Sequence, residues 1–100
     1  MRVSVIIPSR NERYLNKTIS DVFNKAAGDV EVVAVIDGPT DHPLPIDRPG
    51  MTLVINPRPL GFRCAVNQAV AAASGEWLMK LDGHCMVSQD WDEVLKAECD

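Results

Sequence analysis

The residues of this sequence with the clearest potential for chemistry are Asp82 and His84, which are separated by one glycine. They follow a short apolar run that begins at Trp77. Gly83 can adopt backbone angles that other residues avoid, so the carboxylate and the imidazole could converge on one ligand. A carboxylate oxygen beside an imidazole nitrogen suits a divalent ion such as Mn²⁺. The simpler interpretation is a turn at Asp82 and Gly83 with a solvated imidazole, because short motifs often match by chance.

Further polar residues follow apolar runs elsewhere in the chain. Pro8–Glu12 follows the run Val3–Ile7, and Asp37 follows the run Val30–Ile36. The carboxyl ends of parallel strands meet at one edge of a sheet, where open α/β sheets bind their ligands, so these residues are expected to lie together. Arg63 falls in the first turn of an expected helix, where it would attract an anion such as phosphate. Each residue alone also has a structural interpretation as a turn, a helix start or a solvated side chain.

The apolar pattern predicts the elements that must position these residues. Continuous apolar runs, typical of strands buried on both faces, predict strands over 3–7, 30–36, 51–55 and 77–81. Apolar spacings of three and four predict helices over 13–26 and 62–73, and a third apolar stripe starts at Trp91. Pro8 is expected to end the first strand, Ser9 or Asn11 to cap the first helix, and Cys85–Ser88 to form a short strand. The alternation predicts an α/β fold with a mostly parallel sheet of about four strands flanked by helices.

Length and composition limit the class of protein. The 100 residues form one expected domain, 1–100, and 46% of them are hydrophobic, which excludes a disordered chain. The net charge of −4 argues against nucleic acid as a partner. No segment approaches the ~20 apolar residues of a transmembrane helix. The three cysteines form no C-x-x-C pair, which is typical of free thiols in a reducing compartment, so a cytoplasmic location is expected.

Four segments resemble, in order and spacing, the motifs of GT-A fold glycosyltransferases of family 2 and the related polypeptide N-acetylgalactosaminyltransferases. Val3–Glu12 is similar to VSVIIPxxNE, and Val33–Asp41 is similar to VVDDGSTD. Gly61 with Asn67 is similar to GxxxARN. Gly75–Cys85 is similar to GEYIxFLDADD, with D-x-H in place of D-x-D. The D-x-H-C form is most similar to the polypeptide transferases.

The resemblance implies a Rossmann-like GT-A half domain, a glycosyltransferase activity, and a nucleotide-sugar donor, namely a UDP-sugar bound with Mn²⁺ (or Mg²⁺). The metal would hold the diphosphate and offset charge on the leaving group. Ile36 replaces the first acid of the usual Asp-Asp pair, and Val66 replaces the usual arginine, for which Arg63 can substitute. Carried onto this sequence, the metal ligands are Asp82 and His84, and the donor-binding residues are Pro8, Arg10, Glu12, Asp37, Arg63, Asp82 and Gly83.

The complete activity stays open at this point. In the resembled family the acceptor-binding half and the catalytic base follow the part that this sequence matches, so the domain is expected to be incomplete and no catalytic residue is assigned. The alternatives are a non-catalytic nucleotide- or metal-binding module and a nucleotidyltransferase, although the second lacks a glycine-rich, lysine-bearing phosphate loop. A second copy of the chain or a partner protein could cover the apolar surface left by the missing half.

Overall fold

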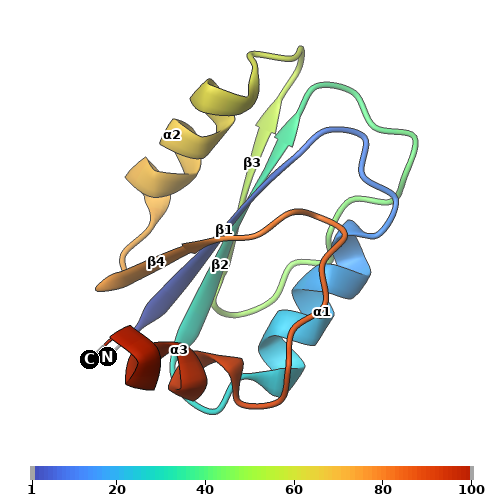
Figure 1. Ribbon diagram of the computed structural model, residues 1–100. Coiled ribbons are helices and arrows are strands. Elements are labelled where there is room, and N and C mark those ends of the chain that lie inside the picture. The colour runs from blue at the N-terminus through green and yellow to red at the C-terminus, as the bar shows by residue number, and fades with distance from the viewer. Residues whose placement is uncertain (1, 100) are drawn as a thin grey trace.

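The computed structural model describes residues 2–99 as one parallel sheet with helices on both faces (Figure 1). The strands lie in the order β3-β2-β1-β4, and each neighbouring pair is parallel. This confirms the predicted α/β fold and its order of elements. No helix in this part of the chain is long and apolar enough to cross a membrane. The elements are β1 (Val3–Ser9), α1 (Leu15–Lys25), β2 (Val30–Asp37), β3 (Met51–Asn56), α2 (Phe62–Ala72), β4 (Trp77–Lys80) and α3 (Trp91–Cys99).

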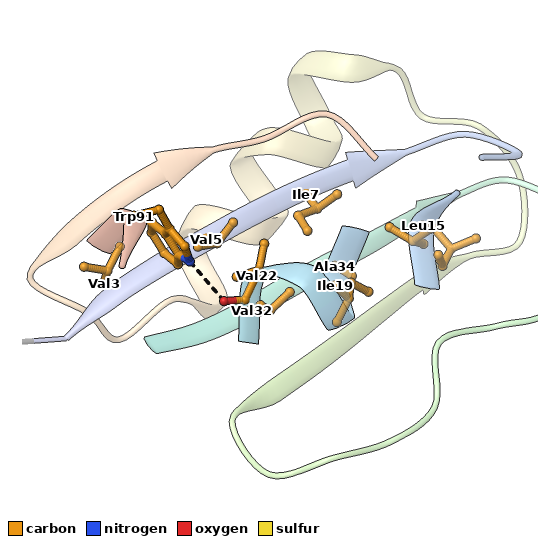
Figure 2. Packing of buried hydrophobic residues seen from close by; sticks show 10 residues of the cluster. Val3, Val5, Ile7, Leu15, Ile19, Val22, Val32, Ala34 and Trp91 are labelled. Carbon is orange, nitrogen blue, oxygen red and sulfur yellow. Dashed lines mark hydrogen bonds between the residues drawn. The ribbon is translucent and has the colours of Figure 1, made fainter. Parts of the chain in front are cut away.

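The central strands are buried on both faces because helices cover both. On one face, Val3, Val5 and Ile7 of β1 pack against α1 and α3 (Figure 2). On the other face, Ile6 packs in a second apolar cluster with Ala65 of α2. The small side chain of alanine allows α2 to lie close to the sheet. Burial on both faces confirms the prediction for β1 and β2, whereas the edge strands β3 and β4 carry exposed residues.

Trp91 and Asp92 tie α3 to α1. The Trp91 indole packs in the core, and its Nε1–H donates to the carbonyl of Val22 at 3.0 Å (Figure 2). Asp92 is fully buried and accepts the backbone N–H groups of Ala27 and Gly28, both at 2.7 Å. Burial raises the pKa of Asp92, but the amide hydrogen bonds outweigh it, so the pKa lies below its usual range. The chain after β4 is therefore fixed to the C-terminal end of α1.

Pro8 does not end β1, contrary to the prediction. The backbone N–H that proline lacks would have had no hydrogen-bond partner in a neighbouring strand at this position. The pairing of β1 with β2 continues one residue beyond it. Even-numbered residues of β1 direct their backbone groups toward β4, since the carbonyl of Ile6 accepts the N–H of Leu81. β4 ends at Lys80, opposite Ile6. The N–H that proline lacks would therefore have faced a position with no strand residue beside it.

Two predictions at the ends of other elements were also wrong. Helix α1 begins at Leu15 with Tyr14 as its N-cap residue, and no side chain caps it. The Ser9 hydroxyl instead donates to a carbonyl of β2, and the side-chain carbonyl of Asn11 accepts an N–H from the loop after β2. The segment Cys85–Ser88 forms no strand, because side chains of α1 bind its backbone in place of a neighbouring strand.

Candidate functional site

The candidate residues surround the edge of the sheet where the carboxyl ends of β1, β2 and β4 lie. β2 and β3 are on one side of β1, whereas β4 is on the other. The strand order therefore reverses between β1 and β4, and ligands of open α/β sheets bind outside such a reversal. Glu12 follows β1 and His84 follows β4, and Nδ1 of His84 lies 3.2 Å from Oε2 of Glu12. The structure thus brings two predicted site residues together at the strand reversal.

Glu12 is held by two contacts besides His84. Its Oε1 accepts the backbone N–H of Tyr14 at 3.2 Å, at the start of α1. Its Cγ lies against Gly83, where an added Cβ atom would be only 2.6 Å away. Gly83 is not among the glycines with positive φ. The glycine therefore permits close packing of Glu12, rather than the unusual backbone angles that the sequence suggested.

Helix α1 holds the segment that follows β4. The hydroxyl of Thr18 donates to the carbonyl of Gly83 at 2.8 Å, and both residues are buried. Asp21 accepts the N–H of Val87 at 2.8 Å, and Lys25 donates to the carbonyl of Val87 at 3.0 Å. Thr18 lies three and four positions from Leu15 and Val22, at the spacing that predicted a buried stripe on this helix. Thr18, Asp21 and Lys25 are three and four positions apart, so they lie on one face of α1. This spacing is the signal by which the sequence could have revealed a polar face on the helix.

Asp82 extends into solvent beside Lys80, whose Nζ is 3.5 Å from Oδ1. Asp82 and His84 therefore have different partners, and among the described residues no three His, Cys, Asp or Glu side chains are grouped as a metal site. Two side chains suit an ion whose other ligands are substrate phosphates and water, as is usual for Mg²⁺ bound with a nucleotide. A metal on these two side chains would therefore need further ligands, such as water or substrate phosphates, to complete its coordination.

The carboxylate of Asp37 is 4% exposed and already accepts three hydrogen bonds. Backbone N–H groups of Leu60 and Gly61 donate at 2.8 and 3.0 Å. The side-chain amide of Asn56 donates at 3.0 Å. The bond from Leu60 is the main cause that holds the pKa of Asp37 below its usual range, and it outweighs the opposing effect of burial. Asp37 is therefore ionised at neutral pH and fixes the start of α2 near the ends of β1 and β2.

A hollow of about 230 Å³ opens beside Asp37, between the end of β1 and the start of α2. It is smaller than the ~300–1,000 Å³ of typical small-molecule sites, so it suits one part of a ligand. Phe62, the first residue of α2, is one wall of the hollow and is 60% exposed. Phe62 begins the range over which apolar spacing predicted a helix, but its side chain is not buried against the sheet. The lining residues are Pro8, Ser9, Arg10, Asp37, Gly61, Phe62 and Ala65.

The predicted donor residues thus form two groups. Pro8, Arg10 and Asp37 line the hollow. Glu12, Gly83 and His84 pack together at the strand reversal. Arg63, in the first turn of α2, and Asp82, after β4, are exposed outside both groups.

Comparison with known proteins points to one family. The family described as Glycosyl transferase family 2 matches residues 4–100. An uncharacterized glycosyltransferase of Haemophilus influenzae is 27% identical over 101 residues, which cover 93% of this chain and 31% of that protein. Glycosyltransferase GlyA of Streptococcus pneumoniae is 28% identical over 100 residues, which cover 94% of this chain and 14% of that protein. The chain therefore spans less than a third of the length of these relatives.

The crystal structure of TarS from S. aureus has a similar fold, with a TM-score of 0.76 and 20% identity. The similarity covers 97% of this chain and 19% of the TarS chain, and at this identity it shows the fold alone. The parallel sheet with its reversal beside β1 is thus a Rossmann-like GT-A half domain. Because the family match runs from β1 through α3 and includes both groups of candidate residues, this chain belongs to glycosyl transferase family 2.

Proposed function

We propose that this domain binds the nucleotide-sugar donor of a glycosyltransferase, a UDP-sugar, together with a divalent ion. The observation that carries the proposal is the contact between Glu12 and His84 at the strand reversal, on the same edge as the hollow beside Asp37. Family membership supports a nucleotide sugar as the ligand. Since the chain covers 31% and 14% of two relatives, the role proposed for these residues is donor binding.

In the proposed complex, the nucleoside occupies the hollow between β1 and α2. Pro8 and Phe62 offer apolar contacts there, and Arg10 adds a positive charge on the wall. The N–H groups of the first turn of α2 favour the anionic diphosphate, because that turn holds no acidic residue and the Asp37 carboxylate binds only the preceding N–H groups of Leu60 and Gly61. Arg63 adds a second guanidinium in that turn, and guanidinium groups bind phosphate oxygens in pairs of hydrogen bonds.

Asp82 and His84 are the residues that would hold the ion, Mn²⁺ or Mg²⁺. When bound, the ion holds the diphosphate and offsets the charge that develops on the leaving group. Glu12 engages Nδ1 of His84, which leaves Nε2 as the nitrogen available for a metal. Glu12 is thereby a positioning residue, since a carboxylate on the second ring nitrogen fixes the orientation of the imidazole.

Calorimetric titration of UDP and of GDP, with and without Mn²⁺, tests this proposal. UDP is expected to bind more tightly when Mn²⁺ is present. Asp82→Asn and His84→Ala should each weaken Mn²⁺-dependent UDP binding at least about tenfold, without loss of stability, because both side chains are exposed. Asp47→Asn, in the exposed loop between β2 and β3, is the matched control. Equal UDP affinity in the wild type and in both site variants would contradict the assignment.

A further inference from the structure

Lys80 is a cation at the same edge of the sheet that no sequence motif assigned to the donor site. Along β4, Trp77 and Met79 pack into the core on the α1 side. Because side chains alternate along a strand, Leu78 and Lys80 face the α2 side, and both are exposed. Lys80 lies opposite Ile6 of β1, so its backbone position is fixed by the sheet.

The ammonium of Lys80 lies between an aromatic ring and a carboxylate. Its Nζ is 4.9 Å from the centroid of the Phe62 ring and 3.5 Å from Oδ1 of Asp82. A cation near the face of an aromatic ring is attracted by the charge distribution of the ring. Since Phe62 also lines the hollow beside Asp37, Lys80 keeps a positive charge between that hollow and Asp82.

The ion pair between Lys80 and Asp82 is weak enough for another cation to replace Lys80. The side chains of Lys80 and Asp82 are 45% and 56% exposed, and ion pairs with this exposure contribute little to stability. A divalent ion on Asp82 would compete with the ammonium and repel it. The three N–H donors of the lysine would then be available to an anion beside the ion. In a nucleotide complex that anion is the diphosphate.

We propose that Lys80 is a diphosphate-binding residue of this site. It neutralises Asp82 before ligands arrive, and it contacts the nucleotide diphosphate once a divalent ion has taken Asp82. The inference rests on the proposed nucleotide function and adds a residue to it. Lys80 competes with the metal but attracts the nucleotide, so removal of its charge must change the two affinities in opposite directions.

The test compares Lys80→Met, which keeps an unbranched side chain beside Phe62, with Lys80→Arg, which keeps the charge. Calorimetry on the full chain measures the affinity for Mn²⁺ alone, and the affinity for UDP at a Mn²⁺ concentration that saturates every variant. For Lys80→Met we expect Mn²⁺ to bind about two- to fivefold more tightly and UDP about two- to fivefold more weakly, the range set by exposed ion pairs. Lys80→Arg should remain close to the wild type. Lys96→Met, in α3, is the control for loss of a lysine elsewhere.

Two results would overturn the inference and leave the donor site intact. One is an unchanged pair of affinities in Lys80→Met, and the other is a change of both in the same direction. Binding of neither ligand by the wild-type chain would instead refute the proposed function, and the inference with it. Urea unfolding of each variant, with midpoints equal to that of the wild type, separates a local change in binding from a loss of fold.

Discussion

Replacement of Thr18 by valine tests whether α1 fixes the segment after β4. Thr18 is 2% exposed, and its hydroxyl donates at 2.8 Å to the carbonyl of Gly83, which is also buried. Valine keeps the branched shape and removes the donor. The carbonyl of Gly83 then loses a hydrogen bond in a place that solvent scarcely reaches. A buried carbonyl left in this way costs about 1–3 kcal/mol of stability.

A loss of this size can be measured in urea, since domains unfold with free energies of about 5–15 kcal/mol. In thermal unfolding, each kcal/mol lowers the midpoint of a domain of this size by about 4–8 °C. Amide exchange adds a local measurement at Val87, whose N–H bonds to Asp21 at 2.8 Å. This amide should exchange faster in Thr18→Val, because the segment that begins at Gly83 opens more readily.

Thr52→Val is the matched control, because Thr52 is exposed on β3 and surface substitutions change stability by less than about 0.5 kcal/mol. Thr18→Ser keeps the hydroxyl and removes a buried methyl group, so it should retain slow exchange at Val87. Wild-type stability in Thr18→Val, with unchanged exchange at Val87, would refute the idea that α1 holds this segment.

Two further predictions concern buried carboxylates. Asp92→Ala removes the acceptor of two backbone N–H groups, both at 2.7 Å. The free energy of unfolding, measured in urea, should fall by about 2–4 kcal/mol. A loss below about 1 kcal/mol would contradict this expectation. Burial raises the pKa of Glu31, but hydrogen bonds, the largest from Ser4, lower it by more, so the pKa in the folded state lies below its ordinary value. The stabilising effect of the Glu31 carboxylate is therefore complete above the ordinary glutamate pKa of about 4.3. It is lost as the pH falls through the lower folded-state pKa. Glu31→Gln should therefore lose less stability than the wild type between pH 7 and about pH 3, measured as the urea midpoint, and an equal loss would exclude this role.

The fold could be predicted because its strongest signals are local. β1 and β2 are buried on both faces, so their apolar runs show strands without any alternation. Parallel strands also share one carboxyl edge, which is why the residues after three strands were predicted to lie at that edge, where the structure separates them into two groups. Pro8 was misjudged because the effect of a proline depends on the neighbouring strand, and β4 ends before it reaches Pro8.

The contacts within the candidate site could not be read from local signals. Glu12 and His84 are 72 residues apart, and they meet because β4 lies beside β1, an order that the alternation of strands and helices does not fix. The three bonds of Asp37 depend on how the chain returns from β3 to α2. Cys85–Ser88 was wrongly predicted as a strand, because the sequence did not show that Asp21 and Lys25 of α1, rather than a neighbouring strand, bind the backbone of Val87. The roles of Asp37 and Asp82 at a nucleotide stay predictions.

The late position of β4 in the sequence also matters while the chain is being made. Val3 pairs with Val30 on one side and with Trp77 on the other, so the second edge of β1 must wait for residues that emerge 74 positions later. At about 5–20 residues per second, that wait on the ribosome lasts about 4–15 s. An open strand edge can pair with another nascent chain during this time. Pro8 offers no N–H on this edge, so such pairing has one backbone donor fewer to use there.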